Sequence, residues 1–535
     1  MIKRLICAIL VLALAGSLWY IASINYDPQF AETAEDKKVS EEDASNVPAY
    51  TDDGSLTIWY ADEALTDYLT GVALSFEQDR GVKVNVVLKD GVQFLEAINE
   101  NSLTESTERT EALPDLFITS HDNLLKAYLA GLASIVSDPE NILTTELYPQ
   151  TALNAVSCYE HYVAYPLYYE TNFFLYNKTY MASIAQNRIE AETDMAEGEE
   201  ATKELEENGA PEEEAGEIET DNAGDNENTD GGEDAGDEII EEDYDPMGEE
   251  DSLADQEVLD RLATMIPATI EDIKTFANNY DAPEAVESVF KWDVSDIFYN
   301  YFFVGNYMEV GGPNGDNAAV FNIYNKQAVE CLSAYQAMNQ FFSIDTKVDD
   351  YNRILQDFID GKMVFTVATT DAIARIHEAQ RNGEFNFEYG VSILPDISSL
   401  LKARGLSVTD VVAVNGYSEK QADANMFATY LVNYKASDLY MKSGKVSCCK
   451  SVEYEDAEIA NVMNEYERSM PLPKMVEASN YWVQLEIAFT KVWKGADPDE
   501  TLKELSDTIG AQIEEIKANL PTQESINAGA GKFVQ

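Results

Sequence analysis

Short apolar runs alternate with amphipathic stretches along most of the chain. The runs Leu56–Tyr60, 82–87 and 363–367 have the length and composition of buried strands. Residues 417–431 and 498–517 instead place apolar side chains at helical spacing. Strands that alternate with helices indicate parallel sheets, which bind ligands at the carboxyl ends of their strands. The pattern therefore predicts an α/β protein.

The segment from Tyr162 to Lys178 combines a Tyr-Pro turn, a run of aromatic residues and a single carboxylate at Glu170. Alternating side chains from Phe173 to Tyr176 predict a buried strand, so Glu170 would lie where that strand emerges. A carboxylate beside aromatic rings suits a polar ligand with flat apolar faces, such as a sugar. An ordinary core strand with a surface glutamate is the alternative interpretation.

The chain begins with a hydrophobic segment. Lys3 and Arg4 precede twenty uncharged residues, Leu5–Ile24. That length spans a hydrocarbon core of ~30 Å at ~1.5 Å per residue, and it also fits a secretory signal. We expect residues 1–25 to be a signal peptide or membrane anchor helix, with the uncleaved anchor favoured. The remainder would be exported to the extracellular face of the cell membrane, anchored or secreted, with residues 26–53 as an acidic tether.

Acidic residues outnumber basic residues by 99 to 35, which gives a net charge of −64. Nucleic acid is excluded as a partner, because phosphate contacts need clustered Lys and Arg. Residues 190–255 contain 30 acidic residues and one lysine, Lys203, and so contribute −29 of the charge. With Tyr244 as its one aromatic residue, this segment lacks the apolar surface that would offset its ordering entropy. We therefore predict a disordered acidic insert.

Residues that support the common catalytic centres are scarce. The sequence has three histidines and lacks a phosphate-binding loop, a nucleophile elbow and a His-Glu-x-x-His motif. Its five cysteines, of which Cys448 and Cys449 are adjacent, show no zinc-binding Cys-x-x-Cys spacing. We expect no cofactor, no metal and no enzymatic reaction, only ligand binding. An extracellular enzyme that uses paired carboxylates on a glycan is the alternative.

Several motifs, taken in order, resemble the extracellular solute-binding proteins of the maltose-binding type (family 1). The segment 162–178 is similar to their AYP…E…YNK crossing between lobes. The resemblance covers roughly residues 54 to 510 and implies a two-lobed periplasmic-binding-protein-like fold of type II, with ligand between the lobes. It divides the chain into lobe 1, 54–168 with 393–445, and lobe 2, 169–392 with 446–535, which holds the insert. Other matching motifs are Pro114–Ile118, His121–Asp122, Phe358–Lys362, Tyr389–Pro395 and Met470–Pro473.

The resemblance also implies a set of ligand contacts. Carboxylates accept hydrogen bonds from sugar hydroxyls, and aromatic faces cover the C–H side of the ring. For each aromatic candidate, core packing is the alternative. The candidate ligand-binding residues are the acids Asp62, Glu63, Asp122, Glu170 and Asp293 and the aromatics Tyr60, Tyr169, Phe298, Tyr481 and Trp482.

The sequence departs from the family where a stacking tryptophan is common, because Ala368–Asp371 stands there. The platform for a long glucan is thereby reduced, and maltodextrin itself fits poorly. Several acids with little nearby base argue against an anionic ligand. We predict a membrane-tethered substrate-binding subunit of an ABC importer, a monomer that captures a neutral solute, with carbohydrate as the favoured class, and delivers it to permease subunits. A glycan-active enzyme and an anchored sensor or scaffold are the alternatives.

Overall fold

The computed structural model describes residues 52–105, 108–207, 253, 255–342, 344–478 and 480–519. The chain divides into two units, and residues 55–102 with everything described after 112 belong to the larger one. In the smaller unit, which includes 103–112, the Glu108 amide donates to the Glu105 carbonyl at 2.8 Å. The predicted anchor, nearly all of the predicted tether and residues 208–252 of the predicted insert lie outside the described residues.

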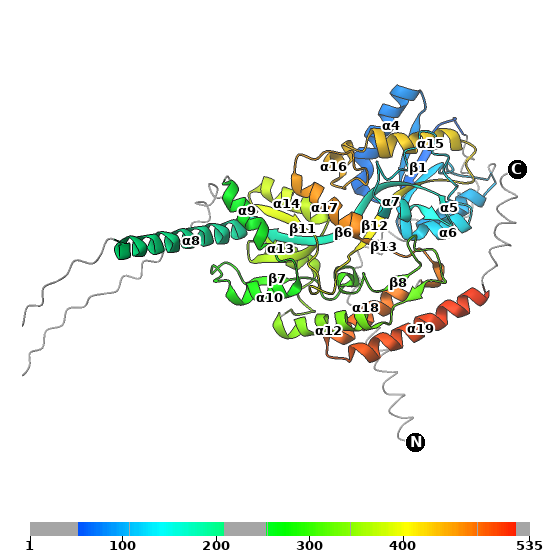
Figure 1. Ribbon diagram of the computed structural model, residues 1–535. Helices are drawn as coiled ribbons and strands as arrows, with labels where there is room; N and C mark the ends of the chain where they lie inside the picture. Colours follow the sequence, from blue (N-terminus) through cyan, green and yellow to red (C-terminus); the bar gives the residue numbers. More distant parts are fainter. Residues whose placement is uncertain are drawn as a thin grey trace, which may run out of the picture. The chain divides into compact units, whose positions relative to one another are not determined.

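One mixed sheet of nine strands forms the centre of the larger unit (Figure 1). Its strands are β1 (Leu56–Tyr60), β2 (Val84–Leu88), β3 (Leu116–Ser120), β6 (Tyr165–Asn177), β7 (Ser288–Lys291), β10 (Met363–Thr369), β11 (Tyr389–Ser392), β12 (Leu406–Val414) and β13 (Met470–Pro471). The order is β2-β1-β3-β12-β6-β10-β7, and in addition β11 pairs with β6 and β13 with β12. Two separate pairs are β4 (Ser157–Cys158) with β5 (His161–Tyr162), and β8 (Glu309–Val310) with β9 (Phe321–Asn322).

Strand β6 joins the two halves of this sheet. Its first part, Tyr165–Thr171, pairs with β12, and its second part, 172–177, pairs with β10 and β11. We call the strands β2, β1, β3 and β12 the β1 half and the strands β10, β7 and β11 the β10 half. Every residue of β6 is buried except the half-buried Glu170. The predicted strand at 173–176 is therefore confirmed but starts earlier, because β12 supplies pairing for the residues before it.

Helices flank the β1 half of the sheet. Helix α4 packs on β2 and α15 packs on β12, while α16 packs on α4. Helix α4 is capped by Gly81, whose φ of 73° is readily available to glycine. The elements of this half are η1 (Glu63–Leu65), α4 (Thr66–Arg80), α5 (Phe94–Leu103), η2 (His121–Asn123), α6 (Leu124–Leu129), α7 (Gln150–Ala155), α15 (Gln421–Thr429), the π-helical η6 (Tyr430–Tyr434) and α16 (Asp438–Ser443).

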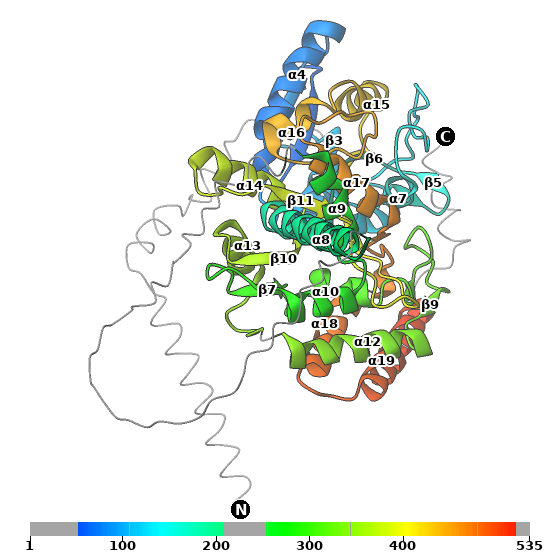
Figure 2. The ribbon, with the colours of Figure 1, turned by 60° about the vertical axis from the view of Figure 1, so that its left-hand side comes forward.

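The β10 half carries the larger set of helices. Helices α12, α18 and α19 pack side by side (Figures 1 and 2). Helix α17 packs against β6 and β11, where the two halves of the sheet join. The elements are α8 (Lys178–Glu207), α9 (Gln256–Met265), α10 (Ile270–Asn279), α11 (Ile297–Asn300), η5 (Tyr301–Phe303), α12 (Lys326–Phe341), α13 (Tyr351–Ile359), α14 (Asp371–Asn382), α17 (Ala457–Arg468), η7 (Val476–Ala478), α18 (Tyr481–Trp493) and α19 (Pro498–Asn519).

The prediction that disorder begins at residue 190 is wrong. Helix α8 continues from the end of β6 to Glu207, and it packs along α9. The Arg261 guanidinium on α9 binds the Glu192 carboxylate on α8, with Nη1 2.9 Å from Oε1. Residues 190–207 include eight Glu and three Ala, both of which have high helix propensity. The prediction considered the negative charge of this stretch but did not consider its helix propensity.

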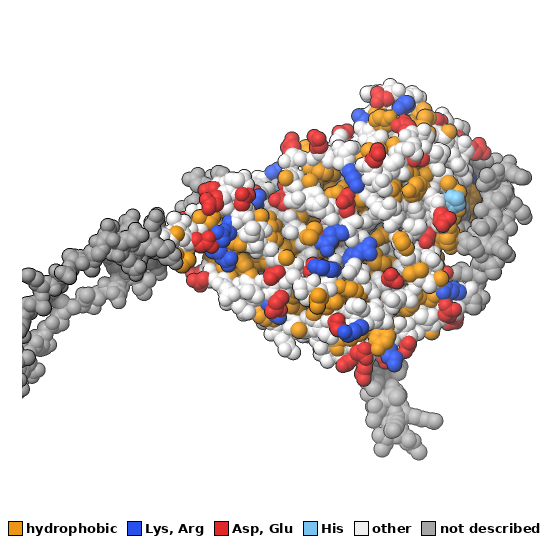
Figure 3. Space-filling view, viewed as in Figure 1, with side chains coloured by type: hydrophobic (Ala, Val, Ile, Leu, Met, Phe, Trp, Pro, Cys, Tyr) orange, Lys and Arg blue, Asp and Glu red, His pale blue; other side chains and the backbone are white. Residues whose placement is uncertain are grey.

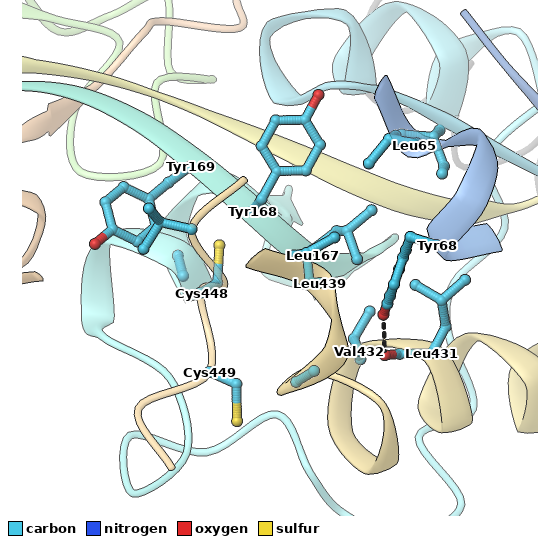
Figure 4. Packing of buried hydrophobic residues seen from close by; sticks show 14 of the residues in the cluster. Leu65, Tyr68, Leu167, Tyr168, Tyr169, Leu431, Val432, Leu439, Cys448 and Cys449 are labelled. Atoms are coloured by element: carbon cyan, nitrogen blue, oxygen red, sulfur yellow. Dashed lines mark hydrogen bonds between the residues drawn. The ribbon is translucent and has the colours of Figure 1, made fainter. Parts of the chain in front are cut away.

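Buried aromatic and aliphatic side chains fill both halves. In the β1 half, the Tyr68 hydroxyl donates to the Leu431 carbonyl at 2.8 Å (Figure 4). In the β10 half, Trp292 and Trp493 meet edge to face with centroids 5.7 Å apart. The neighbours Cys448 and Cys449 are both buried free thiols, and Figure 4 shows their sulfur atoms directed away from each other. They pack as small apolar side chains rather than as a disulfide.

Charge is unevenly distributed over the chain. On the face shown in Figure 3, acidic and basic side chains are interspersed, and several Lys and Arg side chains gather near its middle. The strong acidity of the sequence is therefore not a property of this whole face. Within the described part of the chain, no helix combines the length and the apolar composition that a membrane span requires.

Candidate functional site

A cavity of about 470 Å³ lies at the carboxyl ends of the parallel strands β1, β2 and β3. Loops and helix starts that follow these strands line it: Ala61 and Asp62 after β1, residues 91 and 93–96 after β2, and Asn123 with Lys126 after β3. Ligands of open α/β sheets bind at this edge, where loops present their polar groups. We take this cavity as the candidate ligand site.

Three residues on adjacent strands form a row across one wall of the cavity. Asp410 of β12 is paired in register with Ser120 of β3 on one side and with Tyr168 of β6 on the other. Residues paired in this way project from the same face of a sheet, and all three line the cavity. The register shifts immediately after Asp410, and such an irregularity re-aims the side chains beside it.

A lysine connects the cavity to the strand that joins the two halves of the sheet. Lys445 Nζ lies 3.0 Å from Asp62 Oδ2 and 3.3 Å from Glu170 Oε1. The Tyr168 hydroxyl also donates to Asp62 Oδ2, at 3.4 Å. Burial lowers the pKa of Lys445, but the Glu170 and Asp62 carboxylates outweigh it and raise that pKa above its usual value. Lys445 is therefore a permanent cation that holds the two carboxylates together.

Asp410 is the unusual acid of the site. Its carboxylate has no hydrogen-bond or ion-pair partner in the part of the chain that the structure describes. Burial, followed by the neighbouring carboxylates Glu170, Asp122 and Asp62, raises the pKa of Asp410 to about 7, although Lys445 opposes this. Near neutral pH this group is therefore divided between its neutral and its charged form.

A buried histidine holds the loop after β3 in place. The Thr409 amide donates to His121 Nδ1 at 3.0 Å, so Nε2 carries the proton and donates to the Leu472 carbonyl at 3.0 Å. Burial lowers the pKa of His121 to about 4, so the ring is neutral at physiological pH. The neighbouring Asp122 accepts a hydrogen bond from the Ser120 hydroxyl. This network links β3, β12 and the segment after β13.

The structure brings three of the predicted acids to the cavity or next to it. Asp62 lines the cavity, and Glu170 reaches it through Lys445. Asp122 lies between the lining residues Ser120 and Asn123. The fourth predicted acid on this side, Glu63, is exposed on η1 and does not line the cavity.

Four other predicted contacts are placed in the core. Tyr60, Tyr169 and Tyr481 are almost completely buried, and Tyr169 stacks on Tyr466 with centroids 3.9 Å apart. Asp293 is also buried, and its carboxylate accepts hydrogen bonds from the Ser295 amide and hydroxyl and from the Tyr351 amide. Both oxygens of the Asp293 carboxylate therefore accept hydrogen bonds within the fold, which leaves this group little capacity to bind a ligand. For the three tyrosines the packing alternative describes what the structure shows.

The remaining aromatics lie in the β10 half. Trp482 is partly buried and meets Tyr301 edge to face, with centroids 5.4 Å apart. Phe298 is partly buried beside Tyr299, which stacks on Tyr351 at 4.8 Å. The Tyr351 hydroxyl donates to Asp371 at 2.8 Å, just beyond the carboxyl end of β10.

Sequence reasoning missed Tyr168, Asp410 and Lys445. Tyr168 could have been found, because side chains alternate along a strand and residue 168 shares a face with Glu170, whereas Tyr169 points to the other face (Figure 4). Asp410 is a lone carboxylate among the apolar residues of β12, the same signal that drew attention to Glu170. No sequence pattern indicates Lys445, whose position depends on the tertiary fold.

A metal centre is not evident in the described residues. Within those ranges, no group of three or more His, Cys, Asp or Glu side chains is placed to hold a metal ion. A second cavity of about 310 Å³ contains His377 and Asp456, whose Nε2 and Oδ2 atoms are 2.8 Å apart. Tyr389 and Tyr440 hydroxyls also contact that histidine, at 3.1 and 3.0 Å, so its ring is held by the surrounding fold.

Solved structures with the same architecture bind sugars, according to their descriptions. The extracellular solute-binding protein from Staphylococcus aureus in complex with maltose is 16% identical, with a TM-score of 0.62, and the match covers 87% of this chain and 100% of that chain. A cyclo/maltodextrin-binding protein complexed with maltotetraose is 14% identical, with a TM-score of 0.61, over 87% and 98%. The maltose-binding periplasmic protein from Listeria monocytogenes in complex with maltose is 18% identical, with a TM-score of 0.59, over 87% and 99%.

No protein-family model matches the sequence, and no curated protein matches it either. At sequence identities of 14–18%, the three matches support a similarity of fold and nothing beyond it. The mixed sheet, the strand β6 shared by its two halves and the three structural matches together confirm the predicted fold class at this level. The chain has the two-lobed α/β fold of the periplasmic-binding-protein type.

Proposed function

We propose that this protein is the substrate-binding subunit of an ABC importer and that it captures a carbohydrate at the cavity beside Asp62, Asp410 and Tyr168. The observation that carries this proposal is the cavity itself, placed where this fold type presents polar groups to a ligand. The carboxylates accept hydrogen bonds from vicinal hydroxyls, and the Tyr168 ring offers an apolar face. The sugars in the descriptions of the three matching structures support the ligand class.

The ligand would close the site by bringing the two lobes together. We propose lobe 1 as 54–168 with 393–445, and lobe 2 as 169–392 with 446–535. The sheet supports this division, since β12 pairs with β3 and α17 packs on β11. Hinge motion about β6 and the neighbouring connections would then bring Phe298, Tyr351 and Asp371 toward the cavity.

Binding without reaction is the favoured activity. Asp62 and Glu170 are both paired with Lys445, and carboxylates can accept hydrogen bonds from hydroxyls. Asp371, bonded to Tyr351, stands where the resembled family has a stacking tryptophan, so maltodextrin is not the first choice of ligand. The clustered carboxylates argue against an anionic solute.

Export and membrane attachment complete the proposal. The segment 1–25 would anchor the protein at the extracellular face, residues 26–53 would form the tether, and permease subunits would receive the solute from a monomer. Carbonate washing of membranes tests the anchor: an uncleaved segment keeps the protein in the membrane fraction, and a mature N-terminus near Ile24 shows release.

Titration calorimetry of the purified protein against a panel of oligosaccharides tests the ligand class, with product analysis of the same mixtures by chromatography. We expect one saccharide class to bind with a stoichiometry of one and to be recovered unchanged. Products formed from a bound saccharide would establish the enzyme alternative. Absence of binding across the panel would contradict the proposal.

A further inference from the structure

Asp410 is an acid of the cavity that is available to a ligand. It lies in the row formed with Ser120 and Tyr168, it lines the cavity, and it has no hydrogen-bond or ion-pair partner among the described residues. The other acids close to it are engaged: Asp62 and Glu170 bind Lys445, and Asp122 accepts a hydrogen bond from Ser120.

The charges that act on Asp410 are predominantly negative. Three carboxylates, Glu170, Asp122 and Asp62, repel its charged form, while a single ammonium group, Lys445, attracts it. Lys445 is itself already shared between two of those carboxylates. A neutral ligand would leave this imbalance in place, and an anionic ligand would increase it. A ligand cation beside Asp410 would compensate it and would form a charge-assisted hydrogen bond.

We propose that Asp410 is a specificity-determining residue and that the carbohydrate taken by this cavity carries an amino group, whose ammonium pairs with the Asp410 carboxylate. The inference rests on the proposed function, and it replaces the expectation of a neutral solute. Tyr168 and Ser120, on either side of Asp410, would contact the ring and its hydroxyl groups. The register shift after Asp410 fixes the direction in which the carboxylate is presented.

Calorimetry with two series of probes tests this pairing. The probes are disaccharides and trisaccharides of glucosamine and the corresponding glucose oligosaccharides, in which a hydroxyl replaces each amino group. The parent protein should bind an amino sugar at least about tenfold more tightly than its glucose counterpart, as expected for a charge-assisted hydrogen bond. Asp410→Asn, which keeps the shape of the side chain but removes its charge, should remove most of that preference.

Two further variants make the result specific. Asp281→Asn makes the same chemical change at an exposed loop position outside the cavity, and it should retain the parent's preference. Asp410→Ser provides a second replacement should Asp410→Asn fail to fold, as judged by thermal melting.

The outcomes separate the inference from the proposed function. Equal affinities of the parent for the glucosamine and glucose series overturn the inference and leave carbohydrate binding intact. An undiminished preference for the amino sugar in both Asp410 variants has the same consequence. No binding of either series overturns the inference, and absence of binding across the wider oligosaccharide panel overturns the proposed function as well.

Discussion

Lys445 Nζ lies 3.0 Å from Asp62 Oδ2, and this ion pair ties the loop after β1 to the segment between α16 and α17. The backbone around Lys445 follows β6, because the Tyr169 amide donates to the Val446 carbonyl at 3.2 Å. Lys445 therefore links a cavity acid to the connection about which the lobes would move. Its effect on the cavity is electrostatic as well as structural.

Replacing Lys445 by methionine should raise the pKa of Asp410 above about 7, because the one positive charge that lowers it is removed. Lys445→Arg keeps the charge and should leave that pKa close to the parent's. The measurement is an NMR titration of the Asp410 carboxyl carbon in the three proteins. Identical titration curves for parent and Lys445→Met would show that Lys445 does not act on Asp410. The loss of stability should be modest, about 1 kcal/mol or less, since the ion pair is partly exposed.

Because His121 is buried in its neutral form, we predict that the folded state loses stability in mild acid. Its folded pKa is lowered to about 4, against an ordinary value of 6.5, so the folded state resists protonation. The stability that this provides is complete above pH 6.5 and is lost as pH falls from 6.5 toward 4. His121→Gln cannot titrate, so the difference in melting temperature between parent and variant should shrink over that range. A difference that stays constant from pH 7 to pH 4.5 would contradict this account of His121.

Two deletions test where the acidic insert begins. Replacing residues 208–252 by a short Gly-Ser linker keeps the contact between Glu192 and Arg261, and it should leave the melting temperature unchanged. Removing 190–255 cuts α8 short and also removes Asp255, whose side chain caps α9 by accepting from the Glu257 amide at 2.8 Å. Loss of such a cap costs ~1 kcal/mol, and the lost packing adds to it. Equal melting temperatures for the two deletions would show that residues 190–207 contribute nothing.

The fold was largely predictable because its signals are local. Apolar runs of strand length indicate an α/β protein, and the ordered motifs around 162–178 indicate its two lobes. Strand β6 illustrates the local signal, because its apolar sequence matches its burial and Glu170 is its one residue that is not buried. The candidate site was less predictable. Of the predicted residues, Asp62 lines the cavity and Glu170 contacts Lys445 beside it, but Tyr169 was chosen instead of Tyr168, although alternation along a strand assigns the face correctly. Lys445 is 275 residues from Glu170 in sequence, and only tertiary structure brings the two together.

The β10 half shows the limit of transferring contacts by resemblance. Asp293 was placed in the site because its position approximates an acidic contact in the resembled family. In this chain its carboxylate is used by Ser295 and by the Tyr351 amide. The position of Asp293 along the sequence therefore matches the resembled family, but the local fold of this chain gives its carboxylate different hydrogen-bond partners.

The most direct test of the central claim, that this cavity binds a carbohydrate, is calorimetric titration of parent, Glu170→Gln and Glu419→Gln with the saccharide that binds the parent. Glu170→Gln keeps the shape of the side chain but removes a charged acceptor, which is worth ~1.5–3 kcal/mol. Glu419→Gln makes the same change at an exposed position outside the cavity. We predict that Glu170→Gln binds about tenfold to a hundredfold more weakly, with at most a small decrease in melting temperature because its ion pair with Lys445 is partly exposed, and that Glu419→Gln binds as the parent does. Equal affinities in all three proteins, or no saccharide that binds the parent, would contradict the account.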